Sequence, residues 1–185
     1  MEVKIDVSDI NLETERLILR PFRETDLQDL YDYASVPGVG EMAGWPYHRS
    51  IEESQEILRS FIDGKNVLAL VHKGGNKCIG SLGFHSSWAA SDLRYGHLRL
   101  TELGYVLAKE YWGQGLMPEA VKAVIDYCFT ELGLEALTCG HFDDNNRSRR
   151  VIEKCGFKFV ENCVFNAKQL NQSFSGKRYI ILRDA

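Results

Sequence analysis

The segment best suited to chemistry is Tyr111-Trp-Gly-Gln-Gly-Leu-Met-Pro118, in which two glycines are separated by one residue. The preceding residues read as a strand, and an amphipathic helix is expected after the segment. The apolar residues at helical spacing are Ala120, Val121, Val124, Ile125, Cys128, Phe129 and Leu132. A strand-to-helix joint presents unpaired N–H groups and the positive end of a helix dipole. Glycines let an anion approach that backbone closely, so the joint is predicted to bind phosphate, unless it is an ordinary glycine turn.

This joint lacks the remaining residues of two common phosphate loops. A dinucleotide-binding loop needs a third glycine three residues after the second, but position 118 is proline, which suits the first turn of a helix. A nucleoside-triphosphate loop needs Gly-Lys-Ser or Gly-Lys-Thr, which this chain does not contain. Neither of these nucleotide-binding motifs is therefore present.

Two further segments flank the joint. Leu12-Glu-Thr-Glu-Arg-Leu-Ile-Leu-Arg-Pro-Phe-Arg-Glu-Thr-Asp26 precedes it, and Asn145-Asn-Arg-Ser-Arg-Arg-Val-Ile-Glu-Lys-Cys-Gly-Phe157 follows it. Taken in order with the joint, which ends in Glu119-Ala120, these segments resemble the GNAT superfamily of acetyl-CoA-dependent N-acetyltransferases. The resemblance covers about residues 12 to 160 and is closest to the branch of ribosomal-protein N-terminal (alanine/serine) acetyltransferases.

The resemblance implies a single GNAT acetyltransferase domain over residues 1–185. Its α/β (α+β) fold has a central mixed, mostly antiparallel sheet with helices on both faces. The sheet splits like a V between strands expected at 98–107 and 136–142, and acetyl-CoA lies in the gap as cosubstrate. The implied reaction acetylates a primary amine, such as the N-terminus of a ribosomal protein. The alternative is a non-catalytic acetyl-CoA-binding or interaction module.

By the same resemblance, cofactor-binding groups are expected at three places. The strand edge at Val106 and Leu107 pairs with the amides of the pantetheine arm. Asn145 binds that arm from the other side, or only caps the helix expected at 146–155. Relatives often have arginine or glutamine at the start of the joint, where this chain has Glu110, so binding is expected to rest on the backbone and the helix dipole. The backbone N–H groups that face the pyrophosphate are those of Trp112, Gly113, Gln114, Gly115, Leu116 and Met117, although Trp112 can equally be a packing aromatic.

Two side chains are the first candidates for proton transfer. Many relatives place a tyrosine acid seven residues after the asparagine, where this chain has Ile152, so Ser148 is the nearest substitute as acid, or binds the cofactor alone. Glu102 is the first choice as base because relatives often carry an acidic residue on this strand. Alternation places Glu102 and Gly104 on one face, and the alternative is a solvated glutamate. The secondary candidates, each better suited to a structural role, are His85, His97 and His141.

Composition fits an ordinary globular enzyme. The chain of 185 residues is about one domain, with 44% hydrophobic and 26% charged residues. It has no run of 18 apolar residues and no signal peptide, so a cytoplasmic protein without a membrane partner is expected. A net charge of −4 argues against nucleic-acid binding and permits attraction of a cationic acceptor.

Cysteine and histidine spacing predicts neither disulfides nor a metal site. The five cysteines contain no Cys-x-x-Cys pair and have mostly apolar neighbours, so reduced, buried thiols are expected. His141, Asp143 and Asp144 have a generic spacing that does not indicate a metal site.

The elements that must position these groups alternate along the chain. Helices are expected after possible capping boxes at Thr25 to Gln28 and Ser50 to Glu53. Apolar residues in the last strands suit either a homodimer, which the resemblance implies, or the monomer core. Loops 36–49 and 86–96, segments that usually wall the acceptor site in the family that the chain resembles, hold the aromatics Trp45, Tyr47 and Trp88, which do not identify the acceptor. The expected strands are 15–22, 67–72, 78–84, 98–107, 136–142, 157–165 and 178–182.

Overall fold

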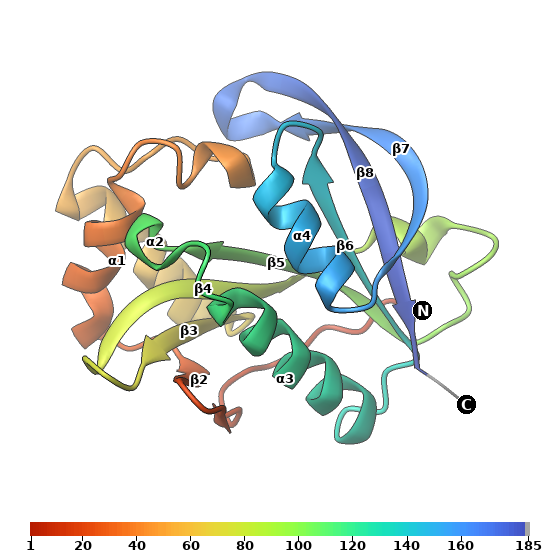
Figure 1. Cartoon of the computed structure of the whole chain (residues 1–185), viewed down its shortest axis with the longest axis horizontal. Helices are drawn as coiled ribbons and strands as arrows, with labels where there is room; N and C mark the ends of the chain where they lie inside the picture. The colour runs from red at the N-terminus through yellow and green to blue at the C-terminus, as the bar shows by residue number, and fades with distance from the viewer. Residues whose placement is uncertain (184–185) are drawn as a thin grey trace.

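A computed structural model describes residues 1–183, which form one eight-stranded sheet with four α-helices (Figure 1). The strands are β1 (Leu12–Glu13), β2 (Leu17–Pro21), β3 (Val67–His72), β4 (Lys77–His85), β5 (Leu100–Leu107), β6 (Ala136–Phe142), β7 (Lys158–Ala167) and β8 (Gln172–Leu182). The helices are α1 (Leu27–Ala34), α2 (Ile51–Gly64), α3 (Leu116–Thr130) and α4 (Asn146–Lys154). The order is β1-β2-β3-β4-β5-β6-β8-β7, and within the described range β5–β6 is the parallel pair. This confirms the predicted mixed, mostly antiparallel α/β fold.

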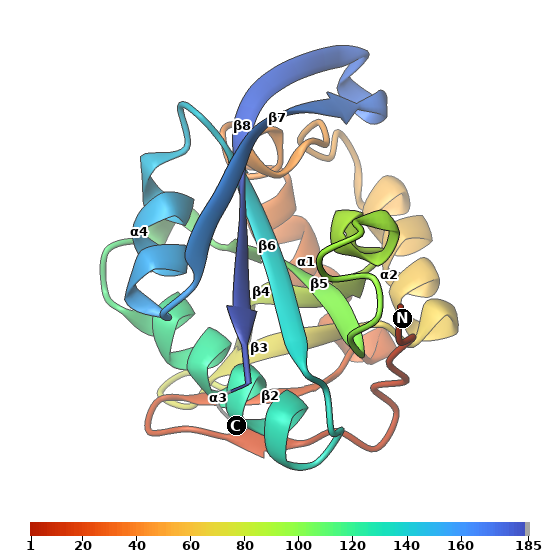
Figure 2. The same cartoon turned by 90° about the vertical axis from the view of Figure 1, so that its right-hand side faces the viewer.

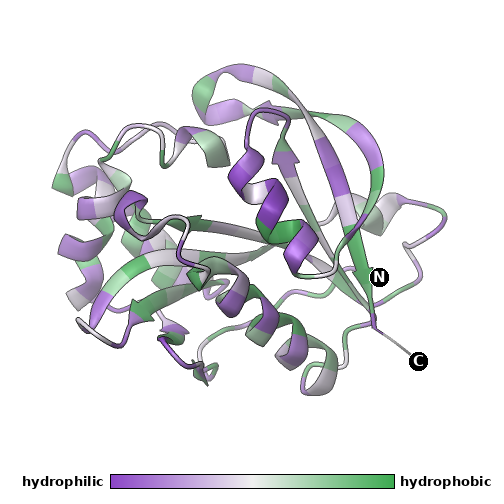
Figure 3. Cartoon of the chain, in the orientation of Figure 1, coloured by the Kyte–Doolittle hydropathy of each residue, from purple (hydrophilic) through white to green (hydrophobic). Residues whose placement is uncertain are grey.

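Helices cover both faces of the sheet. Figure 2 shows α1 and α2 on one side and α3 and α4 on the other. The predicted apolar stripe of α3 is buried, and each fully buried leucine in the strands beneath contributes about 1.5–3 kcal/mol. Figure 3 shows that α4 is mostly hydrophilic, with a short apolar stretch that includes the buried Ile152.

The sheet splits between β5 and β6, as predicted. Their pairing is limited to three positions, the last of which is Glu102 opposite Thr138. Beyond this point β5 continues to pair with β4 as far as Leu107, whereas β6 continues to pair with β8 as far as Phe142. A bulge in β4, where Ile79 has no partner in β3, bends the strand beside the opening. The result is a fork whose inner edge of β5 is free of sheet hydrogen bonds to β6.

Two local predictions are wrong. No capping box forms between Thr25 and Gln28, because the Asp26 carboxylate accepts from the Arg23 N–H at 2.8 Å and caps this turn instead. The last strand begins at Gln172 and not at 178, so β7 and β8 form a long hairpin that arches over the fork in Figure 1. The predicted cap at Ser50 is confirmed, since its hydroxyl accepts from the Glu53 N–H at 3.3 Å.

The cysteines are free thiols, as expected. Cys78, Cys128, Cys139 and Cys155 are buried, and burial raises the pKa of Cys78 and of Cys128 to about 12. Among residues 1–183, no helix is long and apolar enough to cross a membrane. Within the same residues no cluster of three or more His, Cys, Asp or Glu side chains could hold a metal ion.

Candidate active site

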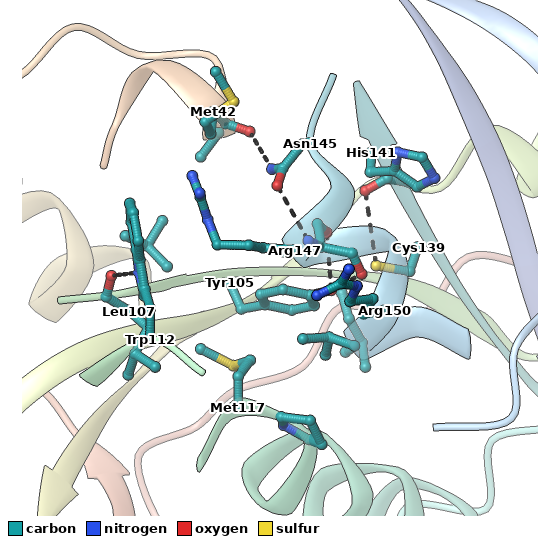
Figure 4. Close-up of a pocket in the computed structure, with 18 of the residues that line it drawn as sticks. Met42, Tyr105, Leu107, Trp112, Met117, Cys139, His141, Asn145, Arg147 and Arg150 are labelled. Carbon is teal, nitrogen blue, oxygen red and sulfur yellow. Dashed lines mark hydrogen bonds between the residues drawn. The ribbon is translucent and has the colours of Figure 1, made fainter. Parts of the chain in front are cut away.

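The fork encloses a cavity of about 580 Å³ between β5, β6, the start of α3 and helix α4 (Figure 4). It brings together nearly all of the residues predicted to bind cofactor or to transfer protons. Those that line it are Glu102, Val106, Leu107, Trp112, Gly113, Gly115, Leu116, Met117, Asn145 and Ser148. Gln114 is not among the lining residues, because its side chain turns back and donates to the Glu110 carbonyl at 2.9 Å.

The start of α3 is built to present free N–H groups. Gly113 and Gly115 have φ angles of 77° and 80°, a left-handed conformation that only glycine adopts at little cost. No side chain caps the helix. Glu119 in its first turn is drawn away from the opening, since its carboxylate pairs with Arg16 at 2.7 Å and accepts from Thr14 Oγ1 at 2.6 Å. The N–H groups are therefore available for an anion, as a phosphate site requires.

Helix α4 adds positive charge to the same cavity. Arg147, Arg150 and Lys154 all line it, and their spacing places them on one face of the helix. The Arg147 guanidinium lies 3.8 Å from the centroid of the Trp112 ring, whose Nε1 donates to the Leu107 carbonyl at 2.7 Å. These cations line the cavity in addition to the backbone N–H groups, and the expectation that anion binding rests on the backbone and the helix dipole stays a prediction. The sequence carried the signal in the i, i+3, i+7 spacing of these cations.

Asn145 joins α4 to the loop opposite. Its Oδ1 accepts from the Ser148 N–H at 3.1 Å, which confirms the capping role that the sequence left open. Its Nδ2 donates to the Met42 carbonyl at 3.2 Å across the mouth of the cavity (Figure 4). A contact between Asn145 and the pantetheine arm stays a prediction.

Tyr105 is the residue that the sequence interpretation missed. Its ring lies in the middle of the cavity in Figure 4, and its hydroxyl lies 3.0 Å from Ser148 Oγ. Burial raises the pKa of Tyr105 well above its usual value, so the phenol stays protonated. Alternation along β5 assigns Tyr105 to the face opposite Glu102, and α4 covers that face. A phenol from β5 thus stands beside the serine that was expected to replace the missing tyrosine of α4.

Glu102 lies where the two strands part. Thr138 Oγ1 donates to its Oε2 at 2.9 Å, and Ser87 Oγ lies 2.7 Å from Thr138 Oγ1. Burial raises the pKa of Glu102 above its usual value. Glu102 is therefore a held, partly buried carboxylate and not a solvated surface glutamate.

His85 faces Glu102 in the β4–β5 register. Its ring occupies space that two glycines leave open: a Cβ on Gly83 would lie 2.7 Å from Nε2, and one on Gly104 would lie 3.0 Å from the ring. Although His85 as a residue is exposed, desolvation of its ring against the strands lowers its pKa, so the ring is neutral at pH 7. A neutral imidazole at this position can accept a proton.

The other predicted residues have different surroundings. His141 also lines the fork cavity, but it is buried and hydrogen-bonded to the Phe142 carbonyl and the Tyr179 hydroxyl, which indicates a structural role. His97 is exposed and lines neither this cavity nor the second cavity described below. Of the loop aromatics, Trp45 lines the second cavity. Tyr47 and Trp88 line neither.

A sheet that splits beside an uncapped helix N-terminus and a cationic helix face suits a ligand that carries phosphate groups. A family model described as acetyltransferase (GNAT) domain matches residues 16–158. The chain therefore belongs to the GNAT acetyltransferases and is an N-acetyltransferase, a family that uses acetyl-CoA.

Relatives and solved structures agree with this assignment. The chain is 30% identical over 152 residues to the uncharacterized N-acetyltransferase YoaA of Bacillus subtilis. The matched region covers 80% of this chain and 82% of YoaA. A GNAT-family acetyltransferase from Bacillus anthracis superposes with a TM-score of 0.80 at 23% identity, over 94% and 98% of the two chains. A ribosomal-protein-S5-alanine acetyltransferase from Vibrio fischeri superposes with a TM-score of 0.72 at 20% identity, over 95% of this chain and 98% of that chain. At these identities the two solved structures show the fold alone.

Proposed function

We propose that this enzyme transfers the acetyl group of acetyl-CoA, bound in the fork, to a primary amine. The observation that carries the proposal is the polarity of the cavity. One end has free helix N–H groups and the cations Arg147, Arg150 and Lys154, which suit a phosphorylated carrier. The other end has the proton acceptors Glu102 and His85.

The residues present fit the parts of acetyl-CoA. The N–H groups of the joint from Trp112 to Met117 bind the pyrophosphate, together with cations of α4. The free edge of β5 at Val106 and Leu107 pairs with the pantetheine arm, and Asn145 contacts that arm from the opposite side. Trp112 braces the site, because its indole joins the end of β5 to Arg147.

Glu102 removes a proton from the acceptor ammonium group, which is the form that predominates at neutral pH. Acetyl-CoA supplies a thioester whose acetyl carbon bonds to the amine nitrogen while its C–S bond breaks and the sulfur keeps the electron pair. The Ser148 hydroxyl donates a proton to that sulfur and recovers one through water from the nitrogen, which loses its second proton as the amide forms, while the proton taken by Glu102 passes to solvent. The Tyr105 hydroxyl, hydrogen-bonded to Ser148 Oγ, positions that serine. His85 is the second candidate for the base.

A thiol-release assay tests the proposal with a panel of amines that includes N-terminal peptides of ribosomal proteins. We expect release of free CoA with at least one amine, and a rise in the melting temperature with acetyl-CoA alone, because a ligand of the folded state stabilises it. Absence of both effects at saturating acetyl-CoA would refute the proposed function.

A further inference from the structure

A second cavity, of about 330 Å³, adjoins the fork on the face of the sheet covered by α1 and α2. The two cavities share lining residues in β4, β5 and the loop before α2. These are Ala43, His85, Gly104, Tyr105 and Val106. A molecule in the second cavity can therefore reach the place in the fork where Glu102 and the end of the pantetheine arm are expected.

The walls of the second cavity are mainly apolar and aromatic. They comprise Leu30, Tyr33, Trp45, Pro46, Ile57, Phe61 and Val67. Its volume lies at the lower end of the range of about 300–1,000 Å³ that is typical of small-molecule sites. Size and lining therefore suit a compact apolar or aromatic group.

The charged lining of this cavity is acidic. Glu53 is the carboxylate that faces it, and no Lys or Arg of the described chain lines it. The buried His48 is held by Ser54 at 2.7 Å between Nδ1 and Oγ, and burial lowers its pKa, so it is neutral at pH 7. The cations that belong to this region of the molecule, Arg147, Arg150 and Lys154, line the fork cavity.

This separation of charge discriminates between acceptors. A protonated amine on its way to Glu102 passes beside one carboxylate, which attracts it. A carboxylate or phosphate on the acceptor would enter an apolar cavity beside Glu53 without a cationic partner, and burial of an unpaired like charge is costly.

We infer that the second cavity holds the body of the acceptor, and that the acceptor is a compact primary amine with an apolar or aromatic body and no carboxylate or phosphate. This inference rests on the proposed function and narrows its substrate class. It favours a small molecule over the N-terminus of a folded protein.

Phenethylamine and phenylalanine form a matched pair for the test, because they differ by one carboxylate. We expect kcat/KM to be at least about 100-fold higher for phenethylamine, the scale on which a site rejects a ligand group it leaves unpaired. Equal use of phenylalanine, or a ribosomal N-terminal peptide that is used better than phenethylamine, would overturn the inference and leave the proposed function intact. Failure of every amine, peptides included, would instead refute the proposed function.

Glu53→Gln tests the role of the single carboxylate. The glutamine oxygen can still accept from the Arg49 N–H, which Glu53 Oε2 does at 2.7 Å, so α2 should still form. We expect kcat/KM for phenethylamine to fall about tenfold and the discrimination against phenylalanine to shrink, with the Kd for acetyl-CoA unchanged. Glu52→Gln is the control, because this exposed residue of the same turn loses the same charge outside the cavity. Equal effects of the two variants would show that Glu53 acts only through the net charge of the protein, and this would overturn its role in the second cavity.

Discussion

Replacing Glu102 with glutamine tests the proton-transfer step at one atom. Thr138 Oγ1 donates to Glu102 Oε2 at 2.9 Å, and a glutamine oxygen can accept the same hydrogen bond. The variant therefore keeps the shape of the fork and removes only the basicity. Loss of a general base lowers rates by about 10²–10⁴-fold, so we expect kcat/KM to fall roughly 100-fold near pH 7, which equals about 2.7 kcal/mol of transition-state stabilisation.

The pH profile gives the sign of this effect. Burial raises the pKa of Glu102 above its usual value of 4.5, and the base works in its ionised form. The wild-type rate should therefore be lost as the pH falls through that raised pKa, and the variant should lack this acidic limb. At high pH the free amine becomes abundant without a base, so the difference between variant and wild type should shrink.

Glu102→Gln should lower the activity of the enzyme but should not lower its free energy of unfolding. A carboxyl group whose pKa is raised by folding binds protons more tightly in the folded state, so the free energy of unfolding falls as pH rises from the unfolded to the folded pKa. Above that window the cost of the buried charge of Glu102 is fully present. We therefore expect Glu102→Gln to keep or increase the free energy of unfolding at pH 7, as measured by urea denaturation.

His85→Gln is the matched comparison, because His85 faces Glu102 across the β4–β5 register. We expect it to lower kcat/KM less than tenfold. If Glu102→Gln kept near-normal turnover at pH 7 while His85→Gln lost 100-fold, the base would be His85. If Glu102→Gln instead destabilised the fold, its low activity would say nothing about proton transfer.

Four further predictions address the cofactor site, the acid, the core and the assembly. Gly115→Glu should abolish acetyl-CoA binding in calorimetry, whereas Gly115→Ala, which shares the strain of a φ angle of 80°, should weaken it less; equal losses would mean that strain and not charge is responsible. Tyr105→Phe should lower kcat about tenfold without changing the Kd for acetyl-CoA, and an unchanged kcat would limit the acid to Ser148 or water. Tyr33→Phe should leave the free energy of unfolding unchanged or raise it by about 1 kcal/mol, because the buried Tyr33 hydroxyl makes no hydrogen bond of good geometry in the described structure; a clear loss would show that its contact with Ser81 is stabilising. Light scattering should give twice the chain mass of 21.0 kDa for the homodimer that the family resemblance implies, and a mass near 21.0 kDa would exclude it.

The strands that the sequence located well are those whose apolar runs end at turn residues. The predicted bounds 67–72 and 136–142 are those of β3 and β6, because both strands lie inside the sheet and are buried on both faces. The first half of β8, from Gln172 onward, was not predicted. Apart from Phe174 and Gly176 its residues are polar, and most are exposed, so backbone pairing with β7 holds them without an apolar alternation that a sequence pattern could reveal.

In the candidate active site, too, the sequence predicted the local features and missed those that depend on long-range packing. The joint from Trp112 to Met117 is local, so its glycines and helix start could be recognised from adjacent residues. The pairing of Tyr105 with Ser148 depends on how α4 lies over β5, which is a long-range contact between segments 43 residues apart. The second cavity likewise depends on the packing of α1 and α2 against the sheet, and no residue pattern within either helix encodes it.

Alternation along β5 places the two proposed proton-transfer steps on opposite faces of one strand. Glu102 and Gly104 share the face of α1 and α2, where Gly104 lines the second cavity and lies beside His85. Tyr105 points to the other face, where its hydroxyl meets Ser148 of α4. In the proposed reaction the amine therefore loses its proton on the acceptor face, and the sulfur gains one on the cofactor face. The side chains of Glu102 and Tyr105 leave the strand on opposite faces, yet both line the fork cavity, and in the proposed reaction the thioester lies between them beyond the pair Glu102 and Thr138.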